Sequence, residues 1–129
     1  MKLATLSWEG DSRDVLSSFP REVKEDIGYA LWQLQSGEIP ENIRPMKSIG
    51  SGVFEIKESD ERSWYRVIYL SKVGNTIYIL HSFEKQSGKT EKRDLETARL
   101  RLAQVNRRLA EEARDAKHKE KKGFSKIKK

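Results

Sequence analysis

The chain has 129 residues, enough for one compact domain, and 36% of them are hydrophobic while another 36% are charged. It has no cysteine, which excludes disulfides and thiolate metal sites, and its two histidines argue against a zinc site. No stretch approaches the roughly 18–20 apolar residues of a membrane helix, and the N-terminus lacks an apolar signal core. We therefore expect a cytoplasmic protein with no membrane association, no metal site and no cofactor.

The formal net charge is +6 and the sequence pI is about 9.5. A basic excess attracts polyanions, so nucleic acid or the ribosome becomes a candidate partner, although such a surface can also serve solubility alone. Much of the excess lies near the C-terminus. We expect residues 1–112 to form the folded domain and residues 113–129 to form a basic, flexible tail, which could bind phosphates or be merely solvated.

The first half of the chain predicts one strand followed by two helices. Alternation over residues 2–8 indicates a strand, and residues 13–18 suit a short helix that Pro20 ends. Apolar positions then recur at helical spacing over residues 21–35 (Val23, Ile27, Ala30, Leu31 and Leu34). Residues 39–51 are typical of an irregular connection. The two helices would form a hairpin inserted after the first strand.

The second half predicts three strands and a final helix. Residues 53–58, 64–70 and 76–83 are rich in β-branched and aromatic side chains, and short turns separate them, which is typical of an antiparallel meander. From Leu95 to about Lys119 an apolar stripe indicates an amphipathic helix. Because the strands have apolar residues on both faces, we expect helices to cover part of each. The fold class is therefore α+β.

Four side chains converge on one sheet face if the strand registers align: Lys57, Arg66, His81 and Lys85. An open patch of this kind suits phosphoryl transfer on RNA. Arginine and lysine stabilise the charge that develops on a phosphate, and histidine can move a proton near neutral pH. The alternatives remain that His81 is structural and that Arg66 is an ordinary exposed cation or pairs with Glu55.

Several other side chains are candidates for RNA binding. Phe83, Tyr65 or Tyr69 could stack on an unpaired base, although aromatic residues in strands usually belong to the core. Lys47 and Lys89 are candidate phosphate contacts. We therefore take Lys47, Tyr69, Phe83 and Lys89 as the predicted RNA-binding set.

Six short segments have an order and spacing that resemble one protein family over about residues 3–102: Phe19–Val23, Asp26–Leu31, Pro45–Lys47, Gly52–Ile56, Tyr65–Tyr69 and Ile79–Lys85. Together they resemble the phage-derived, HigB-like branch of the RelE/ParE toxin superfamily. The resemblance implies a RelE-like fold, with a curved antiparallel sheet, an N-terminal helical hairpin on one face and a C-terminal helix.

The resemblance also implies the toxin of a type II toxin–antitoxin system, a ribosome-dependent mRNA endoribonuclease. In such enzymes the RNA's own 2′-hydroxyl attacks the adjacent phosphate without a metal. Arg66 would clamp the phosphate beside Lys57 and Lys85, His81 would carry the proton, and Phe83 would pack behind it or stack a base. The implied partners are mRNA on the ribosome and a cognate antitoxin, a small helix-turn-helix protein encoded nearby.

Two positions depart from the family's pattern. Gln86 follows Lys85 where a second lysine is common, and Glu91 follows Thr90 where proline is common. Lys89 could replace the missing cation. Two other functions stay open: a ParE-like toxin that inhibits DNA gyrase, and a non-catalytic phage remnant that binds an antitoxin or RNA.

Overall fold

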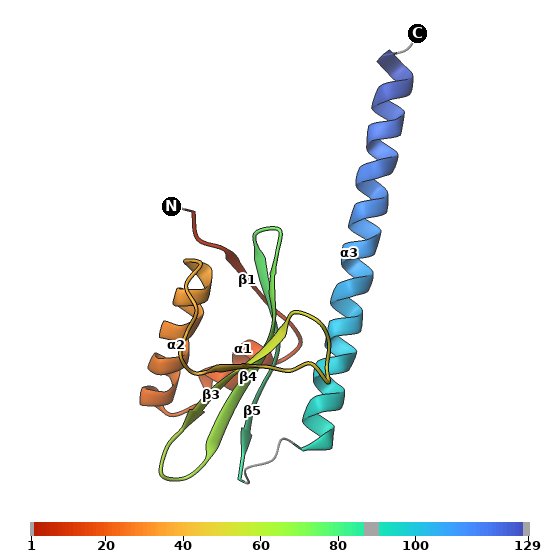
Figure 1. Ribbon diagram of the computed structural model, residues 1–129. Coiled ribbons are helices and arrows are strands. Elements are labelled where there is room, and N and C mark those ends of the chain that lie inside the picture. The colour runs from red at the N-terminus through yellow and green to blue at the C-terminus, as the bar shows by residue number, and fades with distance from the viewer. Residues whose placement is uncertain (1, 87–90, 128–129) are drawn as a thin grey trace.

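A curved five-stranded sheet forms the centre of the protein, with strand order β1-β5-β4-β3-β2 (Figure 1). The computed structural model describes residues 2–86 and 91–127. The strands are β1 (Thr5–Trp8), β2 (Ile43–Pro45), β3 (Val53–Ser59), β4 (Trp64–Val73) and β5 (Thr76–Lys85). The predicted α+β class is confirmed.

Strands β3, β4 and β5 pair antiparallel, as expected. Strand β2 also pairs antiparallel with β3, whereas β1 joins β5 in parallel. A helix, not a strand, follows β1 in the chain, so no tight hairpin imposes an antiparallel partner on it. Strand β2 lies within residues 39–51, which we had interpreted as irregular. Its three residues sit at the sheet edge, where a strand ending in Pro45 is tolerated.

Helices α1 (Ser12–Ser17) and α2 (Arg21–Gln35) lie on one face of the sheet, as predicted (Figure 1). The bounds of α2 match the predicted residues 21–35. The apolar stripe of α2 packs on side chains that project from this face, and together they form the larger core: Val23, Ile27, Ala30 and Leu31 with Ile56, Tyr65, Val67, Tyr69, Ile77 and Ile79.

Helix α3 (Lys92–Ile127) covers part of the opposite face and closes a second core. There Ala98 and Val105, both fully buried, belong to the same cluster as the strand residues Ile68 and Leu80. The predicted cover on both faces of the sheet is therefore confirmed.

Two arginines two helical turns apart hold α3 against the connection between β1 and α1. Arg101 pairs with Asp11 at 2.9 Å, and Arg108 pairs with Glu9 at 2.7 Å. A Cβ atom at Gly10 would collide with the Arg101 guanidinium, and the φ of +54° at Gly10 favours glycine for a second reason. This connection therefore has little tolerance for a larger residue at position 10.

The C-terminal half of α3 extends well past the sheet and away from the body (Figure 1). The helix crosses position 113 without a break and ends at Ile127, beyond the predicted end near Lys119. Residues 110–120 are exposed throughout. The division into a folded domain of residues 1–112 and a tail of residues 113–129 stays a prediction. No helix within residues 2–86 and 91–127 has the length and apolar character needed to cross a bilayer.

Candidate functional site

The strand register brings the four predicted catalytic side chains to one face of the sheet. Lys57 lies directly across from Arg66, and Arg66 lies directly across from Phe83. His81 and Lys85 flank Phe83 at a spacing of two residues on β5, so they share its face. The predicted convergence is confirmed, while the chemical role of each residue stays a prediction.

Three of the four side chains are buried, so the open patch that we expected is not what the fold provides. Lys57 is exposed, whereas Arg66 is 7% exposed, His81 8% and Lys85 3%. The first turns of α3 cover His81, and neighbouring strand residues enclose Arg66. The expectation that Arg66 is an ordinary exposed cation is therefore wrong, and the alternative that it pairs with Glu55 is correct.

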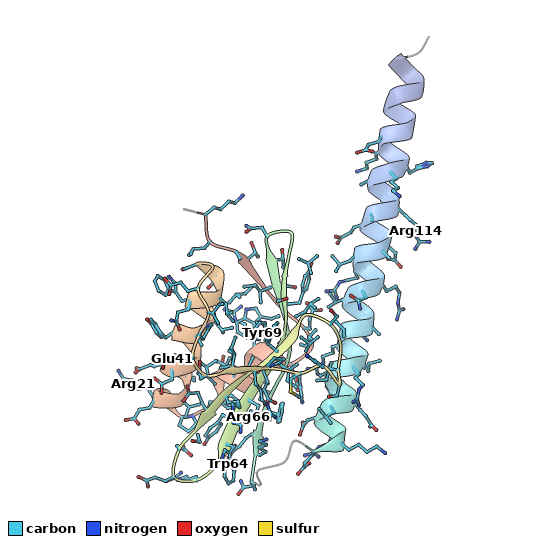
Figure 2. The ribbon with its side chains drawn as sticks, in the orientation of Figure 1. Arg21, Glu41, Trp64, Arg66, Tyr69 and Arg114 are labelled. Atoms are coloured by element: carbon cyan, nitrogen blue, oxygen red, sulfur yellow. The ribbon has the colours of Figure 1, made fainter. Side chains whose placement is uncertain are left out.

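Glu55 lies at the centre of the basic group and is fully buried. Its Oε1 atom accepts a hydrogen bond from Arg44 Nε at 2.9 Å and lies 3.4 Å from Arg66 Nε. Arg66 also donates through Nη1 to the carbonyls of Glu58, at 3.1 Å, and Tyr65, at 3.0 Å. The guanidinium, labelled in Figure 2, is thus held by a carboxylate and two backbone oxygens.

The site has more positive than negative side chains. The strand residues Arg44, Lys57, Arg66 and Lys85 share a face with the carboxylate of Glu55. Burial lowers the pKa of Lys85, and the nearby Arg66 lowers it further, while Glu55 opposes both effects. Burial also lowers the pKa of Arg66, against the attraction of Glu55. An anion bound here would relieve this imbalance.

Both ring nitrogens of His81 are engaged. Nε2 lies 2.8 Å from Asp94 Oδ1, and Nδ1 lies 3.3 Å from Arg101 Nη1. A guanidinium can only donate, so the hydrogen-bond network assigns the acceptor role to Nδ1 and places the proton on Nε2, which donates to Asp94. The ring stacks on Phe83 at a centroid distance of 5.0 Å. His81 therefore links α3 to the sheet, and both of its ring nitrogens have partners within the protein.

The predicted RNA-binding residues are scattered. Phe83 is 5% exposed and packs behind His81, in agreement with one of its two predicted roles. Tyr69 is 1% exposed on the opposite face, where it stacks on Phe54, so its predicted role in binding RNA does not fit the fold. Lys47 is exposed between β2 and β3. Lys89 lies outside the described residues.

Four residues of the site were not among the predicted site residues: Arg44, Glu55, Asp94 and Arg101. A signal existed for Glu55, because strand alternation places it on the face of Lys57. Arg44 lies in the segment that we interpreted as irregular, and the roles of Asp94 and Arg101 depend on how α3 docks. Within residues 2–86 and 91–127, no group of three or more His, Asp or Glu side chains could hold a metal ion.

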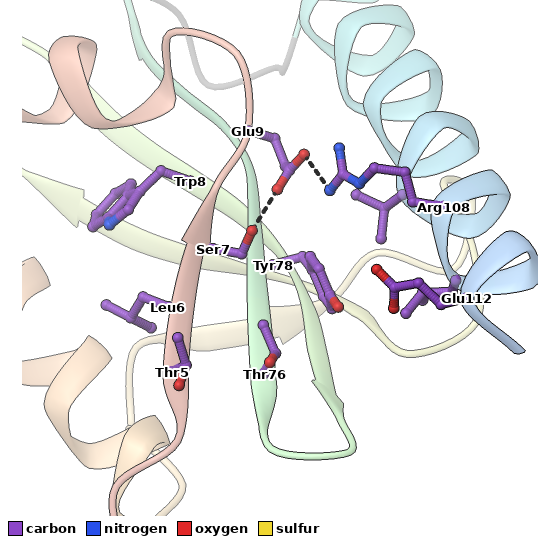
Figure 3. Close-up of a pocket in the computed structure, with 11 residues that line it drawn as sticks. Thr5, Leu6, Ser7, Trp8, Glu9, Thr76, Tyr78, Arg108 and Glu112 are labelled. Atoms are coloured by element: carbon purple, nitrogen blue, oxygen red, sulfur yellow. Dashed lines mark hydrogen bonds and ion pairs between the residues drawn. The ribbon is translucent and has the colours of Figure 1, made fainter. Parts of the chain in front are cut away.

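A cleft of about 620 Å³ lies between β1, β5 and α3, away from the basic group (Figure 3). Its walls include Tyr78 from β5 and Leu109 from α3. At one end, Glu9 accepts a hydrogen bond from the Ser7 hydroxyl and pairs with Arg108, both at 2.7 Å. None of the predicted site residues lines this cleft, so it is a separate surface feature beside the last helix.

The family model "Phage derived protein Gp49-like (DUF891)" matches residues 14–103, more than half of the chain. The chain belongs to this Gp49-like family. The match includes most of α1, the whole of α2, strands β2 to β5 and the first part of α3, and therefore Arg44, Glu55, Lys57, Arg66 and Lys85. No curated protein matches the chain significantly.

Two solved toxin structures are similar to the chain. A mutant of the Escherichia coli toxin RelE in the free state superposes with a TM-score of 0.53 at 15% identity, covering 76% of this chain and 95% of RelE. A chain of the RelBE2 toxin–antitoxin complex from Mycobacterium tuberculosis superposes with a TM-score of 0.46 at 18% identity, covering 67% and 97% respectively. The similarity to free RelE confirms the predicted RelE-like fold, and the family model confirms the predicted resemblance to a phage-derived family.

Proposed function

We propose that this Gp49-like protein is the toxin of a type II toxin–antitoxin system and cleaves mRNA on the ribosome in the cytoplasm. One observation carries the proposal: Arg44, Lys57, Arg66 and Lys85 share one sheet face with the buried carboxylate of Glu55. This arrangement gathers four cations around one buried carboxylate at a fixed place. The phosphate of an RNA strand is an anion that such a group of cations can bind.

The proposed reaction is an intramolecular transfer of the phosphoryl group of the RNA from the 5′-oxygen to the 2′-oxygen. The 2′-oxygen attacks the adjacent phosphorus, the bond to the 5′-oxygen breaks, and the products carry a 2′,3′-cyclic phosphate and a 5′-hydroxyl. Arg66 stabilises the charge on the phosphate because its guanidinium is held rigidly by Glu55 and two backbone carbonyls. Lys57 lies directly across from Arg66 and is exposed, so its ammonium group is a second cation that can contact the phosphate from the solvent side.

We assign the proton-transfer step to Lys85, where the sequence had suggested His81. The lowered pKa of Lys85 makes its neutral form easier to reach, so its amine can accept the 2′-proton. The proton for the leaving 5′-oxygen then comes from the same ammonium or from water. His81 becomes a positioning residue, because Asp94 and Arg101 occupy its two nitrogens.

The site is too small to align the RNA by itself, so we propose that the ribosome positions the RNA for cleavage. A nuclease that acts on translated mRNA is harmful when uninhibited, so we propose a cognate antitoxin, a small helix-turn-helix protein encoded nearby. The cleft beside α3 and the basic group around Glu55 are the two surfaces that such a partner would cover.

Induction of the chain in a bacterial host tests the proposal when growth, translation and mRNA 5′ ends are followed together. We expect growth arrest with new mRNA ends inside translated regions. Growth arrest with intact mRNA and gyrase-dependent DNA breaks would identify a ParE-like toxin instead. Normal growth in a host without the neighbouring gene would indicate a non-catalytic remnant.

A further inference from the structure

The net charge of the protein is confined to its C-terminal end. Residues 113–129 contain eight of the 26 Lys and Arg residues and two of the 20 Asp and Glu residues. The formal charge of residues 1–112 is therefore zero, and the whole excess of +6 belongs to the last 17 residues. Long-range attraction of a polyanion has to originate in these residues, because residues 1–112 have no net charge to act over a long distance.

Most of this charge lies on a helix that leaves the body of the protein, while Lys128 and Lys129 lie outside the described residues. Among the residues of α3 up to position 120, Leu109 is the last that packs on the second core. Beyond it residues 110–120 are exposed, and Figure 1 shows α3 extending away from the sheet. Figure 2 shows Arg114 on this projecting part. We name residues 107–127 the arm.

The arm presents a line of cations on its outer side. Arg107, Arg114 and Lys117 fall within about 80° of one another around the helix, roughly opposite the buried Val105, and Glu111 lies beside this row. All three side chains are exposed, and they span about 15 Å along the axis. A rigid row of this length can contact several phosphates without first becoming ordered.

The composition of the arm excludes two other kinds of partner. Between Leu109 and Phe124 the apolar residues are alanines only. A helix that lies in a membrane surface needs a face of large apolar side chains, and so does a helix that docks in a protein groove. A segment with dense charge and no such face suits a backbone of phosphodiesters.

We propose that the arm binds the phosphate backbone of RNA and brings the neutral catalytic body to its substrate. The choice of RNA over other polyanions rests on the proposed function. The binding itself rests on charge and exposure, so it can be tested without cleavage.

The test compares two variants of the full chain that lose the same charge. The arm variant has Arg107→Gln, Arg114→Gln and Lys117→Gln, and the control variant has Lys2→Gln, Arg13→Gln and Arg62→Gln, all at exposed positions. Binding to a short fluorescein-labelled RNA hairpin is measured by anisotropy over a range of salt concentrations. Circular dichroism establishes that both variants keep the helix content of the wild type.

We expect the arm variant to bind the hairpin about tenfold or more weakly, with a salt slope smaller by about 2, because each lost contact removes roughly 0.7–0.9 from the slope. The control variant should stay within about twofold of the wild type. Equal losses in the two variants would overturn the proposal, as would tighter binding to a DNA duplex of the same length or to phosphatidylglycerol vesicles. A chain that binds RNA through the arm but cuts no mRNA would support this inference and refute the proposed function.

Discussion

The Glu55 carboxylate and the Arg66 guanidinium lie 3.4 Å apart on neighbouring strands, and both are shielded from water. Glu55 Oε2 and Arg66 Nε have no hydrogen-bond partner among the described residues. The pair is therefore held by the attraction of opposite charges more than by a well-formed hydrogen bond. This arrangement keeps Arg66 in place on the sheet face that it shares with Lys57 and Lys85.

The first prediction concerns this pair. We expect Glu55→Gln to lower the free energy of unfolding by about 3 kcal/mol, because removing one partner leaves the buried Arg66 uncompensated. Urea unfolding measures the change. Glu61→Gln, on an exposed turn, is the matched control and should change stability by less than about 0.5 kcal/mol. If the two variants were equally stable, Glu55 would not be the counter-charge that holds Arg66.

The second prediction follows from the lowered pKa of Lys85. Between this lowered pKa and the ordinary value of 10.5, the unfolded chain binds more protons at Lys85 than the folded one does. The contribution of Lys85 to stability therefore rises with pH across that window. We expect the stability of the wild type relative to Lys85→Met to increase from neutral pH towards pH 10.

Urea unfolding at a series of pH values measures this difference. Lys57→Met, at an exposed position on the same sheet face, is the control variant. A curve for Lys85→Met parallel to that of the wild type would show that Lys85 keeps an ordinary pKa, and would remove the basis for its role in proton transfer.

The third prediction separates the two candidate proton carriers. We expect His81→Leu to lower stability by about 1–3 kcal/mol, because Asp94 would lose its partner in a buried position. His81→Gln can still donate to Asp94, and should therefore restore much of this stability and retain most of the cleavage rate. Lys85→Met should lose cleavage by about a hundredfold or more.

Unfolding curves and cleavage rates of the three variants test this assignment together. Should His81→Gln fold normally but cleave as poorly as Lys85→Met, His81 would be the proton carrier that the sequence suggested, and the contacts with Asp94 and Arg101 would have to open during the reaction.

Much of the fold could be predicted because its elements have clear local signals. The apolar stripe of Arg21–Gln35 gave the bounds of α2, and alternation located β3, β4 and β5. The direction of β1 depends on pairing across the chain, which no local pattern records. Strand β2 is three residues long, so its alternation is too brief to distinguish from a loop.

The sequence predicted which side chains share a face of the sheet, but it did not predict that three of them are buried. Parity along each strand grouped Lys57 with Arg66 and Phe83 only on the assumption that the strand registers align, and the structure has this register. Along β5 a register shift leaves Leu80 without a partner across β4, so Ile79 and His81 face opposite sides although they are two residues apart. Strand alternation alone could not reveal this irregularity, nor that α3 would enclose His81.

The central claim is that Arg66 stabilises the phosphate during cleavage, and the rate of mRNA cleavage on translating ribosomes tests it most directly. Because Arg66 is buried and paired, substitution also affects stability, so the comparison uses variants shown to be folded at the assay temperature. We expect Arg66→Met to lower the rate about a hundredfold or more, equivalent to roughly 2–4 kcal/mol of barrier, and the exposed control Arg62→Met to cleave at the rate of the wild type. A folded Arg66→Met variant that cleaves as fast as the wild type would contradict the account.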